Sequence, residues 1–168
     1  MNPGEILAET DWSAVENRNG PAGPETPARL SGLTADPAAA LFHLTHELIE
    51  YPNVYSAAVP AARYVAALLD DPRTGDVELR GRPLRAALLS WLATVADAVS
   101  EARERDFVDL AGYSPMEYPT STFRKVREIL PDLSTAVSTR LDDPDPVVRD
   151  AAVGAAAVIA AAGGWEPG

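Results

Sequence analysis

The sequence contains no cysteine, which excludes a disulfide framework, a thiolate nucleophile and cysteine-ligated zinc or iron–sulfur sites. Residues 1–10 have neither the basic start nor the apolar stretch of a secretory signal peptide. No apolar run approaches the roughly 18 residues that a helix needs to cross a bilayer, and the closest, at 151–164, is short and built of small side chains. We therefore expect a cytoplasmic protein that does not associate with a membrane.

Positive charge is also scarce. Lys125 is the single lysine, and the formal net charge is −11 with a pI near 4.5. Phosphate backbones repel such a surface, so nucleic acid is not expected as a partner. The same charge favours a basic protein partner, although acidity also serves simply to keep a protein soluble.

Signals for β-strands are almost absent, since there is no Asn-Gly hairpin sequence and no sustained alternation of β-branched residues. Helical spacing, with apolar residues at steps of three and four, is widespread. It is clearest at Leu41, Leu44 and Leu48, at Leu84, Leu88, Trp91, Leu92, Val95 and Val99, and at Val126, Ile129, Leu130, Leu133, Val137 and Leu141. Because 46% of the residues are hydrophobic, we predict one globular all-α domain over residues 1–168.

A short phrase recurs at the ends of the predicted helices. It begins with leucine and closes on Asp-Pro, at 33–37, 69–72 and 141–144, with spacings near one and two steps of about 36 residues. The leucine closes a buried stripe, the aspartate caps the next helix, and the proline occupies its first turn or enforces the corner. A helix, a corner and a second helix repeated at such a period is the plan of an α-solenoid.

These signals divide the chain into a capping segment and about three helix pairs. We predict a capping helix and linker at 1–26, helix pairs at 27–51, 52–105 and 119–162, and an ordered insertion loop at 106–118. The capping helix is expected near 5–16. In the second pair, a polar loop at 71–82 leads into one helix over 83–105. The first helix of the third pair contains Pro131 and is expected to kink there.

Residues 130–152, whose centre reads Leu-Asp-Asp-Pro-Asp-Pro-Val-Val-Arg, resemble a HEAT repeat. The resemblance lies in a proline-containing first helix, an Asp-Pro corner, and Val-Arg with paired alanines opening the second helix. Residues 59–72 resemble the first half of another repeat. This implies a short HEAT-like α-solenoid. It also implies a structural role for Asp145 and Arg149, whose equivalents in HEAT repeats brace neighbouring corners through hydrogen bonds and ion pairs.

A narrower resemblance is to small actinobacterial HEAT-like proteins. It rests on Asp-Trp-Ser at 11–13 and on Tyr-Ser-Ala-Ala-Val-Pro at 55–60, beside the HEAT pairs. Some of these proteins are associated with toxin systems, which implies a non-catalytic protein-binding solenoid, an immunity or accessory protein that masks a basic partner. The alternative is a HEAT-like enzyme or nucleic-acid-processing module similar to alkyl-base DNA glycosylases, whose basic grooves do not suit this acidic chain.

One predicted helix carries side chains that are able to bind a metal ion. His43, His46, Glu47 and Glu50 are spaced so that they share one helical face. Their order is not the His-Glu-x-x-His of metalloproteases, and no cysteine supplements them. The same residues equally form a polar face opposite the leucines of that helix. We predict a polar or partner-contacting face, with no metal and no cofactor.

Carboxylates and aromatic rings near that helix form the predicted partner-binding surface. Such groups suit an arginine-bearing partner through cation–π contacts and charge-assisted hydrogen bonds, and the alternative is a solvated charged stripe. The predicted contacts are His46, Glu47, Glu50, Tyr51, Tyr55, Asp97, Glu101, Tyr113 and Tyr118. We expect the acidic groups on the concave side, which second helices of HEAT pairs line. The sequence holds no nucleophile elbow, phosphate-binding glycine loop or dinucleotide fingerprint, so no catalytic residue is assigned.

Overall fold

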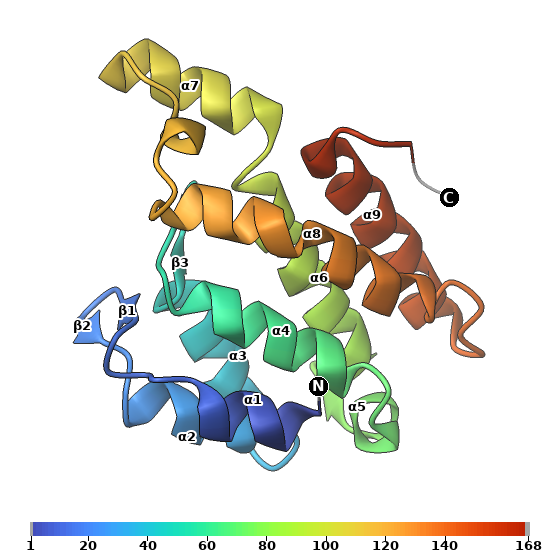
Figure 1. Ribbon diagram of the computed structural model, residues 1–168. Helices are drawn as coiled ribbons and strands as arrows, with labels where there is room; N and C mark the ends of the chain where they lie inside the picture. Colours follow the sequence, from blue (N-terminus) through green and yellow to red (C-terminus); the bar gives the residue numbers. More distant parts are fainter. Residues whose placement is uncertain (1, 167–168) are drawn as a thin grey trace.

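The computed structural model describes residues 2–166 of the chain (Figure 1). These residues form nine α-helices, one 3-10 helix and six two-residue strands, which confirms the predicted predominantly helical class. The α-helices are α1 (Pro3–Glu9), α2 (Glu25–Ser31), α3 (Pro37–His46), α4 (Ala58–Leu68), α5 (Pro72–Asp76), α6 (Leu84–Asp97), α7 (Glu101–Ala111), α8 (Thr122–Ser138) and α9 (Pro146–Gly163). The remaining elements are β1 (Glu16–Asn17), β2 (Gly20–Pro21), β3 (Ile49–Glu50), β4 (Asn53–Val54), β5 (Glu78–Leu79), β6 (Arg82–Pro83) and the 3-10 helix η1 (Pro115–Glu117).

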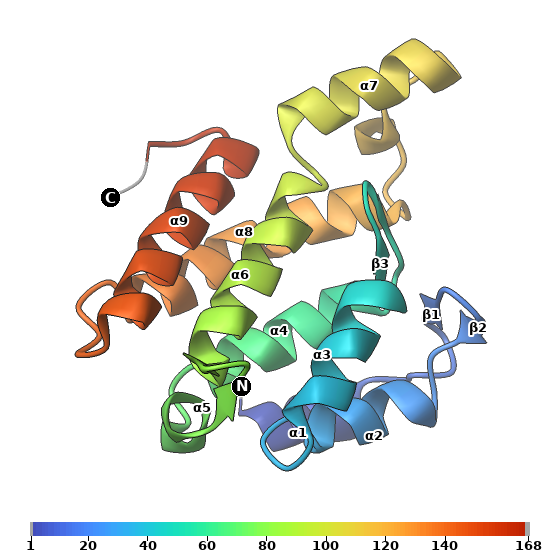
Figure 2. The same ribbon diagram turned by 180° about the vertical axis from the view of Figure 1, so that it is seen from behind.

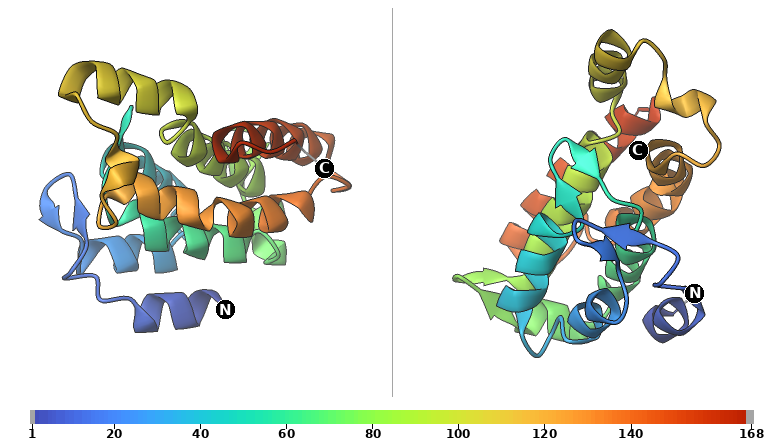
Figure 3. Two further views of the ribbon diagram at one scale, coloured as in Figure 1. Left: turned by 45° about the horizontal axis from the view of Figure 1, so that its top comes forward. Right: turned by 90° about the vertical axis from the view of Figure 1, so that its left-hand side faces the viewer.

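The long helices pack in two layers around a shared apolar core. Figure 1 faces the layer that contains α1, α4 and α8, and Figure 2 faces the layer that contains α3, α6 and α9. The helix α6 is central because it contacts α9 most extensively and also touches α3, α4, α5 and α8. In both views of Figure 3, α7 projects beyond the two layers. The largest fully buried side chains are Leu30, Leu33, Leu44, Leu48, Leu69, Leu84, Leu88, Leu89, Leu92, Ile129, Leu130 and Leu133.

Three antiparallel hairpins, β1–β2, β3–β4 and β5–β6, occupy corners between helices. The sequence carried no signal for these strands, because strands of two residues leave no alternating pattern to detect. In β5–β6 the turn residues Arg80 and Gly81 have φ values of 53° and 76°, as a tight two-residue hairpin turn requires. The predicted polar loop at 71–82 is therefore α5 followed by this hairpin.

The N-terminal helix is shorter than the predicted 5–16. It ends at Glu9, and the chain then turns back so that Trp12 is buried. The indole Nε1 of Trp12 donates a hydrogen bond to the carbonyl of Leu7 at 3.1 Å, which fixes this return. The next residues enter β1–β2, leaving no room for a longer helix.

The Asp-Pro phrases lie at the starts of helices, but at the third corner the capping aspartate is not the one that was predicted. Asp36 and Asp71 accept hydrogen bonds from backbone N–H groups in the first turns of α3 and α5, at 3.2 and 2.9 Å. At the third corner Asp145 caps α9 in the same way at 2.8 Å, and Asp143 turns inward. A proline follows each capping aspartate at the start of its helix, where the missing N–H costs nothing.

Asp143 turns inward because it pairs with Arg85 of α6. Their side chains are 3% and 10% exposed, and Nη1 of Arg85 lies 3.1 Å from the carboxylate. Arg85 also donates to the hydroxyl of Thr74 at 3.0 Å and to the carbonyl of Asp71 at 2.9 Å. One guanidinium therefore joins α6 to the start of α5 and to the corner that precedes α9.

Asp145 and Arg149, the residues expected to brace neighbouring corners, act within a single corner. Asp145 caps α9, and Nη1 of Arg149 donates to the carbonyls of Asp143 and Pro144 at 2.7 and 3.1 Å. The buried ion pair between corners is supplied by Arg85 with Asp143, which the HEAT resemblance did not indicate.

The predicted helix over 83–105 is divided, and the predicted insertion loop at 106–118 is largely helical. The hydroxyl of Ser100 accepts a hydrogen bond from a backbone N–H in the first turn of α7 at 3.4 Å. α7 then continues until Gly112, whose φ of 82° ends it, and η1 follows. The prediction failed because it divided one amphipathic helix between its charged first half and its apolar second half.

The third predicted pair lies where it was expected, as α8, with Pro131 inside it, and α9. By length and composition alone, α9 is apolar enough to cross a membrane. The expectation that no run approaches this length was therefore wrong. That prediction began the run at 151, because the charged residues Arg149 and Asp150 lie near the helix start. Of this helix 33% is buried, and it packs against α6 and α8.

Gly154 within α9 and Gly164 directly after it are expected to respond oppositely to alanine. Gly154 has a helical backbone with open space around it, so Gly154→Ala should raise the free energy of unfolding by about 0.5–1 kcal/mol. Gly164 ends the helix with a φ of 77°, so Gly164→Ala should lower it by about 1 kcal/mol. Urea denaturation measures both changes. Shifts in the same direction for the two variants would contradict this assignment.

Candidate functional site

The β3–β4 hairpin gathers predicted partner contacts that are distant in sequence. The hydroxyl of Tyr51, at the hairpin tip, donates a hydrogen bond to Asp97 at the end of α6. The guanidinium of Arg103 lies over the Tyr51 ring, 5.8 Å from its centroid, and pairs with Asp106 at 2.9 Å. The pKa of Tyr51 is raised above its ordinary value. The hydrogen bond to Asp97 is the larger cause, and burial is the next. Half of the Tyr51 side chain remains exposed, so this cluster is open to a partner.

Glu50 and Tyr55 form a second contact within the same hairpin region. The Tyr55 hydroxyl donates to the Glu50 carboxylate at 2.9 Å, which raises the pKa of Tyr55. Arg18, in the β1–β2 turn, approaches Glu50 at 3.9 Å. Glu50 therefore contacts both Tyr55 and the neighbouring β1–β2 turn.

Tyr113 and Tyr118 lie in an exposed aromatic cluster that follows α7. The rings of Phe107 and Tyr113 are 5.5 Å apart, and those of Tyr113 and Tyr118 are 5.2 Å apart, both in edge-to-face geometry. Such pairs stabilise one another beyond the area they bury. The structure thus brings the two predicted tyrosines together and adds Phe107 to them.

The predicted face of His43, His46, Glu47 and Glu50 is not formed as one surface. His43 is buried, and its Nε2 lies 2.8 Å from the Thr26 hydroxyl. His46 is exposed beside an aromatic ring of its own helix, and Glu47 accepts a hydrogen bond from the Asn19 side chain. The sequence spacing missed that α2 covers one side of α3. Among residues 2–166, no three His, Asp or Glu side chains are placed to share a metal ion.

The buried position of His43 makes stability depend on pH. Burial lowers the pKa of His43, against the smaller opposing effects of Glu25 and Glu47. In the unfolded chain the imidazole takes up a proton near its ordinary pKa of 6.5, whereas in the folded protein it does so only at lower pH. The stabilisation is present above pH ~6.5 and is lost as pH falls through the window between the two pKa values.

We expect the free energy of unfolding of the wild type to decline as the pH falls below ~6.5, and to decline less in His43→Gln. Urea denaturation at each pH measures this. His46→Gln is the matched control and should keep the wild-type decline, because it leaves His43 in place. An equal decline in all three proteins would remove His43 as the cause.

Carboxylates gather near α7 and do not extend along α6 as the predicted concave acidic stripe. The groove between α3 and α6, about 310 Å³ in volume, is lined mainly by neutral side chains, including Thr45, Ser90 and Thr94. Glu101 is exposed on α7, separate from α6. Glu104 is drawn into an ion pair with Arg127 of α8 at 2.8 Å. The acidic surface therefore lies at the end of the molecule formed by α7 and β3–β4.

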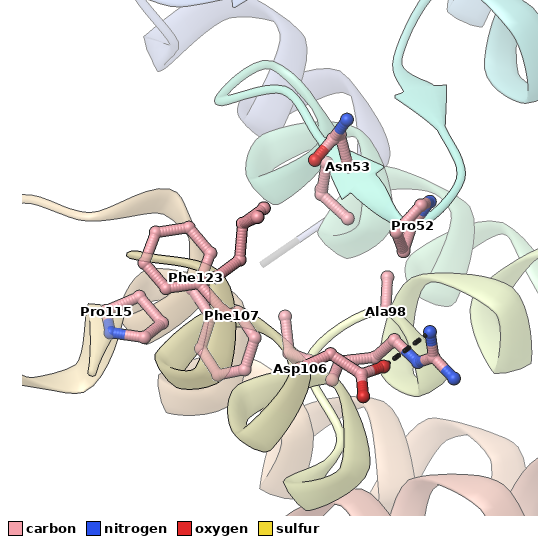
Figure 4. A pocket seen from close by; sticks show the side chains of 11 residues that line it. Pro52, Asn53, Ala98, Asp106, Phe107, Pro115 and Phe123 are labelled. Atoms are coloured by element: carbon pink, nitrogen blue, oxygen red, sulfur yellow. Dashed lines mark ion pairs between the residues drawn. The ribbon is translucent and has the colours of Figure 1, made fainter. Parts of the chain in front are cut away.

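An apolar cleft of about 270 Å³ opens at this end, between β3–β4, the α6–α7 junction, α7 and the start of α8. Figure 4 shows Pro52 and Asn53 on one side of it, with Phe107, Phe123 and Pro115 grouped on another. No described residue of α7 is buried, and Leu110, which also lines the cleft, is 90% exposed.

Phe107, Leu110 and Phe123 were not among the predicted partner contacts. A signal for the first two was present, since Phe107, Leu110 and Ala111 have helical spacing after the N-cap residue Ser100. Assigning the segment to a loop concealed that face. Nothing in the local sequence of Phe123 indicated that α8 would meet the hairpin.

The residues that line the cleft suit non-covalent binding. Its walls are apolar and partly aromatic, and Arg103 with Asp106 gives its rim one ion pair. Together with the exposed tyrosines and carboxylates, this surface offers apolar burial, ring stacking and charge. No family model, curated protein or solved structure matches the chain.

Proposed function

We propose that the protein is a non-catalytic HEAT-like α-solenoid that binds a basic protein partner. The arrangement of the helices in layers supports a solenoid. One layer, of α3, α6 and α9, contains the second helices of the proposed pairs, and the other contains the first helices α4 and α8. Aspartate-capped corners before α3, α5 and α9 support it further. The resemblance to immunity and accessory proteins of toxin systems supplies the class of partner.

The observation on which the proposal rests is the acidic, aromatic end of the molecule. From residue 97 to 117 the chain carries six carboxylates and two guanidinium groups. Exposed aromatic rings at Tyr51, Tyr113 and Tyr118 lie among them. Aromatic residues concentrate binding energy at protein interfaces, and unlike charges speed association and select the partner.

Co-expression with the product of the adjacent gene, followed by affinity purification at low salt, tests this function. A stoichiometric complex that weakens with added salt is expected. The double variant Glu101→Gln with Asp109→Asn, which neutralises two exposed carboxylates of α7, should weaken the complex. The pair Asp132→Asn with Asp150→Asn makes the same charge change on α8 and α9 and should leave it intact. Failure to recover any complex, or equal weakening by both pairs, would contradict the proposal.

A further inference from the structure

We propose that the cleft between α7 and the β3–β4 hairpin receives the apolar anchor of a basic amphipathic helix. This inference rests on the proposed function, because it names the segment of the partner that the acidic end accepts. It places the recognition on α7, outside the groove between α3 and α6.

Part of the apolar surface at this end is left exposed by the described chain. α7 buries none of its residues, yet it presents Phe107 and Leu110 one helical turn apart. Beside them the cleft is walled by Val54, Val99 and Phe123. The cleft, of about 270 Å³, is lined mainly by apolar side chains. Such a lining suits large apolar side chains of a protein partner.

The charges at the rim of the cleft favour a basic partner segment. Arg103, the one guanidinium that lines the cleft, is already paired with Asp106 and stacked on Tyr51. A second carboxylate, Asp97, accepts the hydrogen bond of Tyr51 beside this ion pair, so two carboxylates stand against one guanidinium at this rim. An apolar helix flanked by lysine or arginine thus finds opposite charge around the cleft, and an acidic helix is repelled.

Backbone geometry favours a helix over an extended peptide. An added strand needs a free sheet edge with several N–H and C=O groups in register, whereas β3 and β4 pair only two residues each. The ridge of Phe107 and Leu110 on α7 matches the spacing of anchors on a second helix, at steps of three and four residues.

Fluorescence anisotropy with synthetic peptides tests the inference on the full chain. The probes are a labelled amphipathic helix of leucine and lysine, its leucine and glutamate counterpart, and a leucine–lysine peptide of scrambled order. We expect the amphipathic basic helix to bind, the acidic one not to bind, and the scrambled one to bind at least about tenfold more weakly. Absence of binding by the basic helix at low salt would overturn the inference.

Leu110→Asp separates apolar docking from simple charge attraction. The substitution adds a carboxylate to an acidic surface, so attraction by charge alone predicts equal or tighter binding of the basic helix. Docking in the cleft predicts binding weakened about tenfold or more, because an apolar anchor contact is lost. Val153→Asp makes the same change at an exposed site on α9 and should bind as the wild type does. Thermal unfolding by circular dichroism verifies that both variants are folded.

The two proposals fail in different ways. If Leu110→Asp binds the basic helix as tightly as the wild type does, the cleft is not the docking site, while a salt-sensitive complex with the co-expressed partner still upholds the proposed function. If neither the peptide nor the co-expressed partner binds, both proposals are overturned.

Discussion

Asp143→Asn is expected to lower the free energy of unfolding by about 3–5 kcal/mol, the range found when one member of a buried ion pair is removed. The substitution preserves the shape of the side chain but leaves the guanidinium of Arg85 buried without its counter-charge. Thr74 and the carbonyl of Asp71 continue to accept hydrogen bonds from Arg85, yet neither carries negative charge. Guanidinium chloride denaturation followed by circular dichroism measures the loss.

A surface ion pair provides the control for this result. Arg124 and Glu128 lie 3.3 Å apart on α8 with both side chains exposed. Glu128→Gln makes the same carboxylate-to-amide change and should alter stability by no more than about 0.5 kcal/mol. A loss below about 1 kcal/mol in Asp143→Asn would show that the pair between the corners is not part of what stabilises the fold.

Leu88→Ala is expected to cost about 2–5 kcal/mol, because it opens a cavity in the middle of the core. Leu88 is fully buried on α6, the helix that contacts α3, α4, α5, α8 and α9. Leu110→Ala removes the same atoms from a side chain that is 90% exposed and should change stability by no more than about 0.5 kcal/mol. Denaturation of the two variants in parallel measures the difference. Comparable losses would mean that α7 is packed against the core, contrary to its exposure.

The helical class was predictable because its signals are local. Steps of three and four residues place Val126, Ile129, Leu130, Leu133 and Val137 on one face of α8, and that face is buried. The Asp-Pro phrases likewise mark helix starts through a cap and a fixed proline φ, both properties of adjacent residues. A two-residue hairpin lacks such a repeated signal, so the strands were not predictable.

The contacts that shape the candidate site depend on packing between distant segments. Tyr51 and Asp97 were each predicted as surface residues, but their hydrogen bond depends on where α6 ends relative to β3–β4. The pairing of Arg85 with Asp143 joins residues 58 positions apart, and no local pattern marks it. His43 has a helical spacing that suits a polar face, and only the position of α2 shows that it is covered. The sequence predicted that carboxylates and aromatic rings gather on one surface, whereas the place where they gather depended on the three-dimensional structure.

The isolation of α7 implies that stability is unevenly distributed along the chain. A helix of eleven residues is marginal in water by itself, and α7 is held by the pairing of Glu104 with Arg127, by Arg103 over Tyr51 and by its contacts with η1. Its amide protons are therefore expected to exchange with solvent by local opening, whereas exchange in α6 and α8 requires larger unfolding events. Affinity at this end thus includes the entropy of ordering α7, so substitutions that stiffen the helix strengthen binding without touching the partner.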